Sequence, residues 1–531
     1  MATFAVIAAT ITIFTLQLRT LYTVPVYDSV RWGGDETWLM REFENQSAHG
    51  VMSYPESFGE PQRTDGVLAG SMWVDAVIYG ATGALFFPAH DYDTIGRTVT
   101  AVLALFLLAS VYFILRKLRV SPLIASASVL VVVASQGFVW ATHSARYDLL
   151  TGLTVLWYCY YLSRHENATR AQMFIAGIAG VAAICFSRHL LLLGFGASLV
   201  FLFQQRIWKR PAQLAAWIAG STLAAILLSF AYLVGAGEFS LFGRGGGEGS
   251  YSFVLNQIPI LRPFSRNVQV SNVIERFQLF KIDALGILIV IAISIVLGVA
   301  YWIKGRPRDQ IGRVSSVENF AQKFFLSCTV VCTLVWLLAE GSRPYYLFHI
   351  VPLLIIGTAI VLELGSKLAA LVVLAVGIAF NAARAIPSDV LGAAIARDQS
   401  AAITKFLTET PRNSRILLDV AGLDRALSDT SRHVLTLDMF QPPHDAGALV
   451  QKLISNRIEY VILRSSPVSS SFEPGRALLP QVLDSIGTVR DSAFGFFYDD
   501  GRTYDASQIE LKRQGLDTLR LFRIYSASVT P

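Results

Sequence analysis

The chain has 531 residues, of which 53% are hydrophobic and 15% are charged, and its mean hydropathy is +0.50. A soluble domain carries roughly 25% charged residues, so this composition excludes an ordinary soluble protein and indicates a polytopic membrane protein. The formal net charge of +6 does not indicate a nucleic-acid partner, because the basic residues gather in short loops between apolar runs. The four cysteines also lie inside apolar runs, which argues against a disulfide framework or a zinc site.

A helix needs about 20 apolar residues to cross the hydrocarbon core of a bilayer. Eleven runs approach this length: 3–20, 95–115, 121–140, 149–163, 171–187, 189–204, 213–235, 284–303, 322–339, 345–363 and 367–384. We interpret the first as a retained span, because it has no charged leader and no small-residue cleavage site. The sequence thus predicts an α-helical membrane domain over residues 1–384, followed by a soluble domain over 385–531.

Lysine and arginine in short loops predict the orientation of such a chain. One set of loops is rich in them, at 116–119, 164–170, 206–210, 304–313 and 367. The alternate short loops carry one arginine each, Arg146, Arg188 and Arg343. We therefore expect the first set to be cytoplasmic and the C-terminal domain to be extracytoplasmic, in a multi-pass protein of the cell (plasma or inner) membrane.

Residues 67–87 decide on which side the first polar loop lies. The segment is long enough to cross, but Asp75 falls near its middle, where an aspartate costs roughly 2.5–3.5 kcal/mol on insertion scales. We favour an interfacial or re-entrant helix over a span. The first loop, about residues 21–94, is then extracytoplasmic.

The terminal domain has the pattern of an α/β module. Short apolar strands at 415–420, 433–438 and 460–464 alternate with helical stretches near 398–409 and 446–457, which predicts parallel β-α-β units. Later strands are expected at 494–498 and 519–525, the first closed by a turn at 499–501. No Gly-rich phosphate loop follows a strand, so we favour a rigid cap over the membrane cavity, with acceptor binding as the alternative.

Ionisable side chains gather at the predicted outer ends of the spans. Carboxylates there can deprotonate an acceptor or hold a divalent cation, and arginines can neutralise a phosphate leaving group. The residues are Asp35, Glu36, Arg146, Asp148, Arg188 and Arg343. Each has a structural alternative: Asp35 and Glu36 as solvated acids or a helix N-cap, Asp148 as an ion-pair partner of Arg146, and the other arginines as interfacial anchors.

Four short motifs in this order resemble the GT-C superfamily of membrane glycosyltransferases, within it the family of protein mannosyltransferases and lipid A aminoarabinose transferase. The likeness runs from the first span to about residue 365. The motifs are Gly34-Asp35-Glu36 followed by Trp38, the 67–87 helix followed by Ile95-Gly96-Arg97, Ala145-Arg146-Tyr147-Asp148, and Arg343-Pro344-Tyr345-Tyr346 followed by Pro352.

The resemblance implies transfer of a sugar, with inversion, from a polyprenyl-phosphate donor to a lipid, glycan or protein acceptor on the outer face. It implies that Asp35 is the general base or acceptor-orienting acid, with Glu36 beside it, and that Asp148 is a second acid. Arg146, Arg188 and Arg343 would bind the donor phosphate, while Trp38 and Tyr345 would contact the acceptor. Asp35 and Asp148 could also hold Mg²⁺ or Mn²⁺, the one cofactor considered.

Two other functions compete with a transferase. A transporter or flippase of lipid-linked sugars would place charges near the bilayer midplane and show repeated halves with broken helices. The charges here gather at the outer rim, and the sequence shows no repeat. A scaffold whose outer domain binds a surface polymer would leave the rim acids without a role.

Overall fold

The computed structural model divides the chain into two compact units, residues 1–21 with 64–389 and residues 22–63 with 390–531. The structure describes residues 2–23, 53–57, 60–63, 92–143, 148–183, 189–236, 281, 284–304, 316–339, 344–385, 408–419, 433–440, 442–464, 473–485, 489–496 and 517–524. The segment 67–87 lies outside these residues. The domain boundary at residue 384 therefore stays a prediction from the sequence.

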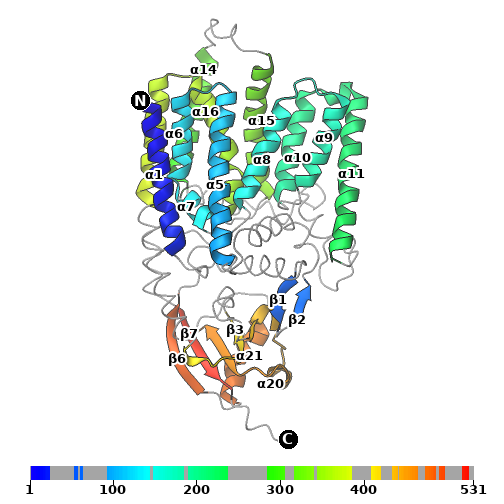
Figure 1. Cartoon of the computed structure of the whole chain (residues 1–531), viewed down its shortest axis with the longest axis vertical. Helices are drawn as coiled ribbons and strands as arrows, with labels where there is room; N and C mark the ends of the chain where they lie inside the picture. The colour runs from blue at the N-terminus through cyan, green and yellow to red at the C-terminus, as the bar shows by residue number, and fades with distance from the viewer. Residues whose placement is uncertain are drawn as a thin grey trace. The chain divides into compact units, whose positions relative to one another are not determined.

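The first unit is a bundle of helices (Figure 1). Each of the eleven apolar runs is helical over most of its described residues. The helices are α1 (Ala2–Thr23), α5 (Tyr92–Lys117), α6 (Pro122–Val133), α7 (Gln136–His143), α8 (Asp148–Ser163), α9 (Arg170–Ala182), α10 (His189–Gln204), α11 (Pro211–Ala236), α14 (Leu285–Lys304), α15 (Ser316–Ala339), α16 (Val351–Glu363) and a last helix at Lys367–Ala385.

Within the described residues, three segments are helical, long and apolar enough to cross a membrane: Gly96–Lys117, Asn319–Leu337 and Lys367–Ala385. Seven shorter apolar helices accompany them. These helices define a mainly α-helical membrane protein. The number of spans, which the sequence sets at eleven, stays a prediction.

The run at 121–140 is not the continuous helix that we expected. It is divided into α6 and α7, with the break at Ala134 and Ser135. The Ser135 hydroxyl donates to the carbonyl of Val132 at 2.7 Å and accepts from the amide of Phe138 at 3.3 Å. A serine that bonds nearby backbone groups competes with the helical ladder, which accounts for the break.

The run at 345–363 also differs from a single helix. It begins as the 3₁₀ helix η4 (Pro344–His349), and α16 starts only at Val351. Pro352 occupies the first turn of α16, where its missing N–H costs nothing. Pro352 has no N–H to donate to the carbonyl of Phe348 four residues earlier, so one unbroken α-helix cannot run through this position.

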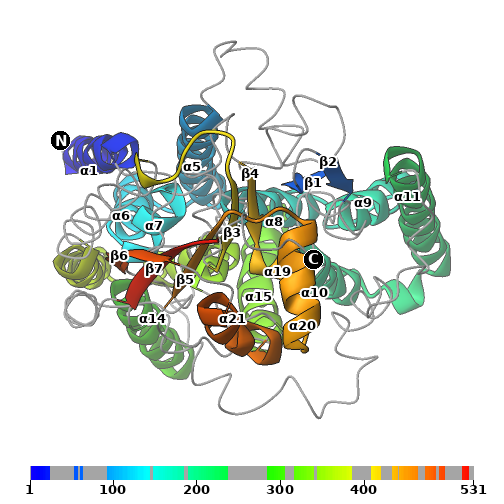
Figure 2. The ribbon, with the colours of Figure 1, turned by 90° about the horizontal axis from the view of Figure 1, so that it is seen from below.

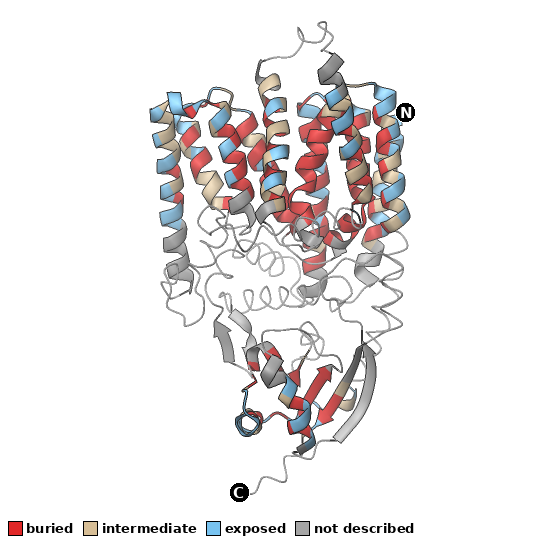
Figure 3. Cartoon of the chain, turned by 180° about the vertical axis from the view of Figure 1, so that it is seen from behind, coloured by how far each residue is buried: buried red, intermediate tan, exposed pale blue. Residues whose placement is uncertain are grey.

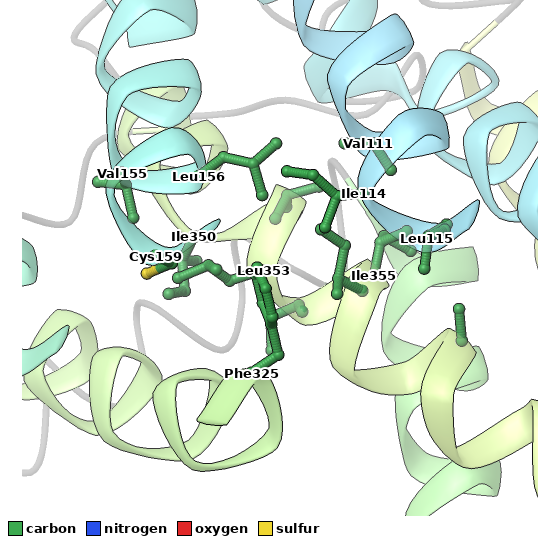
Figure 4. Packing of buried hydrophobic residues seen from close by; sticks show 14 of the residues in the cluster. Val111, Ile114, Leu115, Val155, Leu156, Cys159, Phe325, Ile350, Leu353 and Ile355 are labelled. Carbon is green, nitrogen blue, oxygen red and sulfur yellow. The ribbon is translucent and has the colours of Figure 1, made fainter. Parts of the chain in front are cut away.

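The core of the bundle surrounds α16. This helix packs against α5, α6, α8, α14 and α15, and nearly all of its residues are buried (Figure 3). Figure 4 shows Ile114 of α5, Leu156 of α8 and Phe325 of α15 pointing toward Leu353 and Ile355 of α16. Between helices in a membrane, close van der Waals packing of this kind supplies much of the association energy.

A polar tie fastens three helices near the same core. The amide of Gly286 at the start of α14 donates to Asn381 Oδ1 at 2.7 Å. Asn381 Nδ2 donates in turn to the carbonyl of Val131 in α6 at 2.9 Å. Side-chain amides that bond across helices in this way hold a bundle together.

The second unit contains a five-stranded mixed sheet of strand order β4-β3-β5-β7-β6 (Figure 2). The strands are β3 (Arg415–Leu418), β4 (His433–Thr436), β5 (Tyr460–Arg464), β6 (Val489–Phe496) and β7 (Asp517–Arg523). β3 pairs in parallel with β4 and with β5, as the sequence predicted. β7 joins antiparallel to β5 and to β6.

Three helices accompany this sheet within the described residues. The short α19 (Leu437–Phe440) packs against β3 and β4, and it begins where the strand expected at 433–438 would have continued. The other two, α20 (Ala446–Ser455) and α21 (Glu473–Ser485), pack against each other. α20 matches the expected helix, whereas α21 was not predicted. β6 begins at Val489, earlier than the expected 494, because its pairing with β7 extends the ladder beyond the apolar residues. The antiparallel pair β1 (Ser53–Ser57) and β2 (Glu60–Arg63) was also not predicted.

Candidate active site

The helices of the first unit have their ends on two sides of the bundle, which can be followed in Figure 1. The two sides differ in their side chains. At one end lie the basic residues that the sequence predicted to be cytoplasmic, among them Arg116 and Lys117 at the end of α5 and Arg170 at the start of α9. At the other end α5, α8 and η4 begin. We call it the Asp148 end, because Asp148 is the first residue of α8.

Asp148 forms a buried pair with His349, the last residue of η4. His349 Nε2 lies 3.0 Å from Asp148 Oδ1, within hydrogen-bond distance. The two residues are 1% and 0% exposed. Burying polar groups is costly unless they are hydrogen-bonded, so this contact stabilises both side chains in the interior.

The local sequence favours a carboxylate at this place. Asp148 lies in the first turn of α8, where the unpaired N–H groups and the positive end of the helix dipole stabilise a negative charge. His349 is held by η4, which ends just before α16 begins. The two side chains therefore project from element ends, whose positions are fixed by the packing of α8 against η4.

Gly152 allows α8 and η4 to approach closely. It lies one turn after Asp148, on the same face of α8. A Cβ at this position would lie 2.4 Å from the carbonyl oxygen of Phe348, the residue before His349. A side chain at 152 would therefore push η4 away from α8 and lengthen the Asp148–His349 contact.

Aromatic rings pack next to this pair. The Phe348 ring lies 5.7 Å from the ring of Phe138 in α7, and Phe138 lies 6.4 Å from Phe14 in α1. Phe138 and Phe348 are fully buried, so they exclude water on this side of His349. Hydrogen bonds and charges act more strongly in such a surrounding than in water.

Other buried polar side chains belong to elements that pack here. Arg97 and Thr100 lie in the early turns of α5, and Gln136 and Thr142 lie in α7. α5 packs against α7, α8 and α16, and α7 packs against η4. Arg97, which is 4% exposed, belongs to the second motif of the sequence resemblance. The Asp148 end thus contains a buried arginine, a carboxylate and an imidazole.

Of the residues predicted for the site, the structure places Asp148 with its side chain. The backbone of Tyr345 lies in η4, on the same element as His349. The remaining candidates lie outside the described residues: Asp35, Glu36, Trp38, Arg146, Arg188 and Arg343. Whether they meet Asp148 in one cavity stays a prediction.

The sequence analysis missed His349. Its signal was an ionisable residue inside an apolar run, Tyr345-Tyr346-Leu347-Phe348-His349-Ile350, where such a residue is costly. Arg146, the structural partner that the sequence suggested for Asp148 as an alternative to a functional role, lies outside the described residues. The structure gives Asp148 a hydrogen bond to His349.

No group of three His, Cys, Asp or Glu residues occurs among those the structure describes. Mg²⁺ commonly binds through one or two carboxylates together with phosphate oxygens and water. Asp148 and His349 provide two potential ligands among the described residues. A cation at the Asp148 end therefore stays a prediction.

The chain has the GT-C fold, as the sequence resemblance predicted. The structure is similar to ArnT from Cupriavidus metallidurans bound to undecaprenyl phosphate, with a TM-score of 0.55 and 12% identity over 98% of this chain and 97% of that one. The structure of that protein in the apo state has a TM-score of 0.51 and 13% identity, over 97% of this chain and 98% of that one.

The archaeal oligosaccharyltransferase AglB from Archaeoglobus fulgidus, in complex with an inhibitory peptide and a dolichol-phosphate, has a TM-score of 0.48 and 10% identity over 93% of this chain and 75% of that one. No protein-family model matches the sequence, and a comparison with curated proteins finds no match.

Proposed function

We propose that this chain is a glycosyltransferase that moves a sugar from a polyprenyl-phosphate donor to an acceptor on the extracytoplasmic face of the membrane. The observation that carries the proposal is the likeness of nearly the whole chain to a GT-C protein whose structure contains undecaprenyl phosphate. The sugar is a hexose or a pentose. The acceptor is a lipid, a glycan or a protein.

The proposed reaction needs two kinds of protein group, a carboxylate that accepts a proton and positive charge near the phosphate. The bond between the anomeric carbon and the phosphate oxygen breaks, a bond to the acceptor hydroxyl oxygen forms, and the hydroxyl proton passes to a carboxylate. Polyprenyl phosphate leaves as an anion, so positive charge near it lowers the barrier. One positioned carboxylate and a few arginines can supply both functions.

Each residue of the proposed site has one role. Asp35, with Glu36 beside it, accepts the proton or orients the acceptor, and Asp148 positions the acceptor. Arg146, Arg188 and Arg343 bind the donor phosphate, and Trp38 and Tyr345 contact the acceptor. If Mg²⁺ or Mn²⁺ takes part, Asp35 and Asp148 hold it.

The burial of charge in the described bundle supports a transferase over a transporter. Its buried acidic and basic residues, Arg97, Asp148 and His349, lie in the end regions of α5, α8 and η4. A transporter would hold its substrate near the middle of the membrane, between repeated halves. The clustering of basic residues at the opposite end supports placing the Asp148 end outside the cytoplasm.

The direct test is transfer of radiolabelled sugar from polyprenyl-phosphate donors by membranes that contain the wild-type chain or Asp35→Asn. We expect transfer by the wild type and a loss of about a hundredfold or more in the variant, the usual contribution of general acid–base catalysis. Undiminished transfer would remove Asp35 from the mechanism. No transfer by the wild type with any polyprenyl-phosphate sugar would remove the proposed function.

The orientation is tested separately by placing a cysteine at position 35 and labelling intact cells with a membrane-impermeant thiol reagent. We expect labelling from outside. Labelling that requires opened cells would place Asp35 in the cytoplasm and would contradict an extracytoplasmic site. Three of the four native cysteines, Cys159, Cys328 and Cys332, are buried and should give little background. Cys185 lies outside the described residues, so it is replaced by alanine before position 35 is labelled.

A further inference from the structure

The end of the bundle opposite Asp148 carries a second cluster of side chains, formed by two turns. One turn joins α8 to α9 over residues 164–169, and the other joins α10 to α11 through the 3₁₀ helix η2 (Ile207–Lys209). Gln205 fastens them, because its Nε2 donates to the carbonyls of His165 and Glu166, at 2.7 Å each. Arg210 Nη2 adds a contact to Asn167 Oδ1 at 3.5 Å. The two turns therefore form one surface.

This surface has an excess of positive charge. Residues 164–170 and 204–210 contain one acid, Glu166, and five basic residues that we call the basic patch: Arg164, Arg170, Arg206, Lys209 and Arg210. Four of the five are exposed, and Arg210 is partly exposed. Such a concentration of like charge raises the local density of anions.

Within the part of the chain that the structure describes, no ion pair forms at any residue of the basic patch. The α5–α6 turn at the same end is different. There Arg116 donates to the carbonyl of Val120, and the Lys117 ammonium lies 5.4 Å from the centre of the Phe113 ring. The charges of the basic patch thus remain available to an anion from outside the described chain.

Aromatic side chains lie between these charges. Trp208 is 56% exposed and Phe203 is 71% exposed, and their ring centres are 5.3 Å apart. Ile207, between Arg206 and Trp208, is instead buried and anchors η2 to the bundle. Exposed tryptophan next to lysine and arginine is typical of the level of lipid head groups, which favours a membrane lipid over a soluble anion.

The backbone at Arg206 supports a role for its side chain. This residue has a φ of 50° in the left-handed region, where glycine or asparagine is the less costly choice. An arginine in this conformation places a guanidinium group at the beginning of η2, in the same turn as Lys209 and Arg210. The turn could be built at lower conformational cost without the charge.

We propose that the basic patch, with Trp208, binds the phosphate head groups of anionic phospholipids. Arginine guanidinium groups pair with phosphate oxygens in a bidentate manner, and several cations on one surface bind a lipid of higher negative charge more tightly. This site is separate from the Asp148 end. The proposal does not depend on the proposed transferase activity.

The test is native mass spectrometry of the purified full chain in detergent, titrated with phosphatidylglycerol, cardiolipin or phosphatidylcholine. The variant is Arg206→Gln with Lys209→Gln. The matched control is Lys323→Gln with Lys367→Gln, which removes two exposed charges from the same end outside the basic patch. Inorganic phosphate is titrated as the soluble anion, and thermal unfolding verifies that each variant folds.

We expect the wild type and the control to bind the anionic lipids at least about tenfold more tightly than phosphatidylcholine, and the variant to lose most of this preference. Equal binding of all three lipids by the wild type, an equal loss in variant and control, or tight binding of inorganic phosphate would each overturn the proposal. If the variant fails to fold, the proposal is tested by the salt dependence of lipid binding to the wild type. Ten times more salt should weaken anionic lipid binding alone, and an unchanged affinity would contradict the proposal.

Discussion

His349 Nε2 lies 3.0 Å from Asp148 Oδ1, although the two residues are 201 positions apart in the chain. One residue begins a long helix, and the other ends a short 3₁₀ helix that precedes a proline. Because both side chains are buried, the pair fixes the orientation of a carboxylate at the end of the bundle where the proposed chemistry takes place. Four predictions use this relationship and its surroundings.

Replacing His349 should destabilise the bundle. His349→Ala removes a hydrogen bond from a buried carboxylate, and we expect a loss of roughly 1–3 kcal/mol together with a lower melting temperature. His349→Gln, whose amide can still donate, should restore part of the loss. Thermal unfolding of the detergent-purified protein measures both. His444→Ala, at an exposed histidine of the other unit, serves as the control. Equal melting temperatures for all variants would mean that the contact contributes nothing to stability.

Adding a methyl group at Gly152 should displace η4. The new Cβ would lie 2.4 Å from the Phe348 carbonyl oxygen, so Gly152→Ala should cost about 1–3 kcal/mol and lower transfer activity. Gly194→Ala is the matched control, because its Cβ meets nothing closer than the Gly180 carbonyl oxygen at 3.6 Å. Melting curves and transfer rates of both variants test this. A Gly152→Ala protein as stable and active as the Gly194→Ala protein would contradict the close approach.

Removing the charge of Asp148 should affect chemistry more than folding. Asp148→Asn keeps the shape and a hydrogen-bond partner for His349, so the melting temperature should change little. Transfer should fall by about tenfold or more if the carboxylate positions the acceptor. The change is expected in kcat/KM for the acceptor, with the KM for the donor nearly constant. Full activity in the asparagine variant would leave Asp148 with a structural role only.

Removing the positive charge of Arg343 should weaken donor binding. An arginine that binds the donor phosphate contributes a charge-assisted hydrogen bond, so Arg343→Gln should raise the KM for the polyprenyl-phosphate sugar by about tenfold. Arg384→Gln is a suitable control, because among the described residues the Arg384 side chain bonds a backbone carbonyl, that of Lys281, at 3.0 Å. Transfer rates over a range of donor concentrations separate KM from kcat. A KM that rises equally in both variants would exclude a specific phosphate contact at Arg343.

The sequence predicted the helices of the membrane unit well, because each is encoded locally by an apolar run. α10 was predicted to the residue over 189–204, and the parallel strands β3, β4 and β5 were recognised from short apolar runs. The break between α6 and α7 was missed because Ser135 is a single polar residue inside an apolar run. Its effect depends on the hydrogen bonds that its hydroxyl makes.

The site was predicted in part. Asp148 was chosen because it is an acid at the end of a span, and its position at the start of α8 is as expected. His349 was overlooked because one histidine after two tyrosines has no characteristic spacing. The pattern that would have identified it, an ionisable residue in an apolar run, does not reveal the partner.

The sequence by itself determined that this is a membrane protein, where most of the described helices of the first unit and the strands β3, β4 and β5 lie, and which ends of those helices are rich in lysine and arginine. These properties depend on local composition, which sets the transfer energy of each segment. Only the tertiary structure decided that Asp148 meets His349, because their contact depends on Gly152 admitting the backbone of η4 to the face of α8. The distance between η4 and α8 depends on packing between segments far apart in the sequence, so no local sequence pattern predicts it.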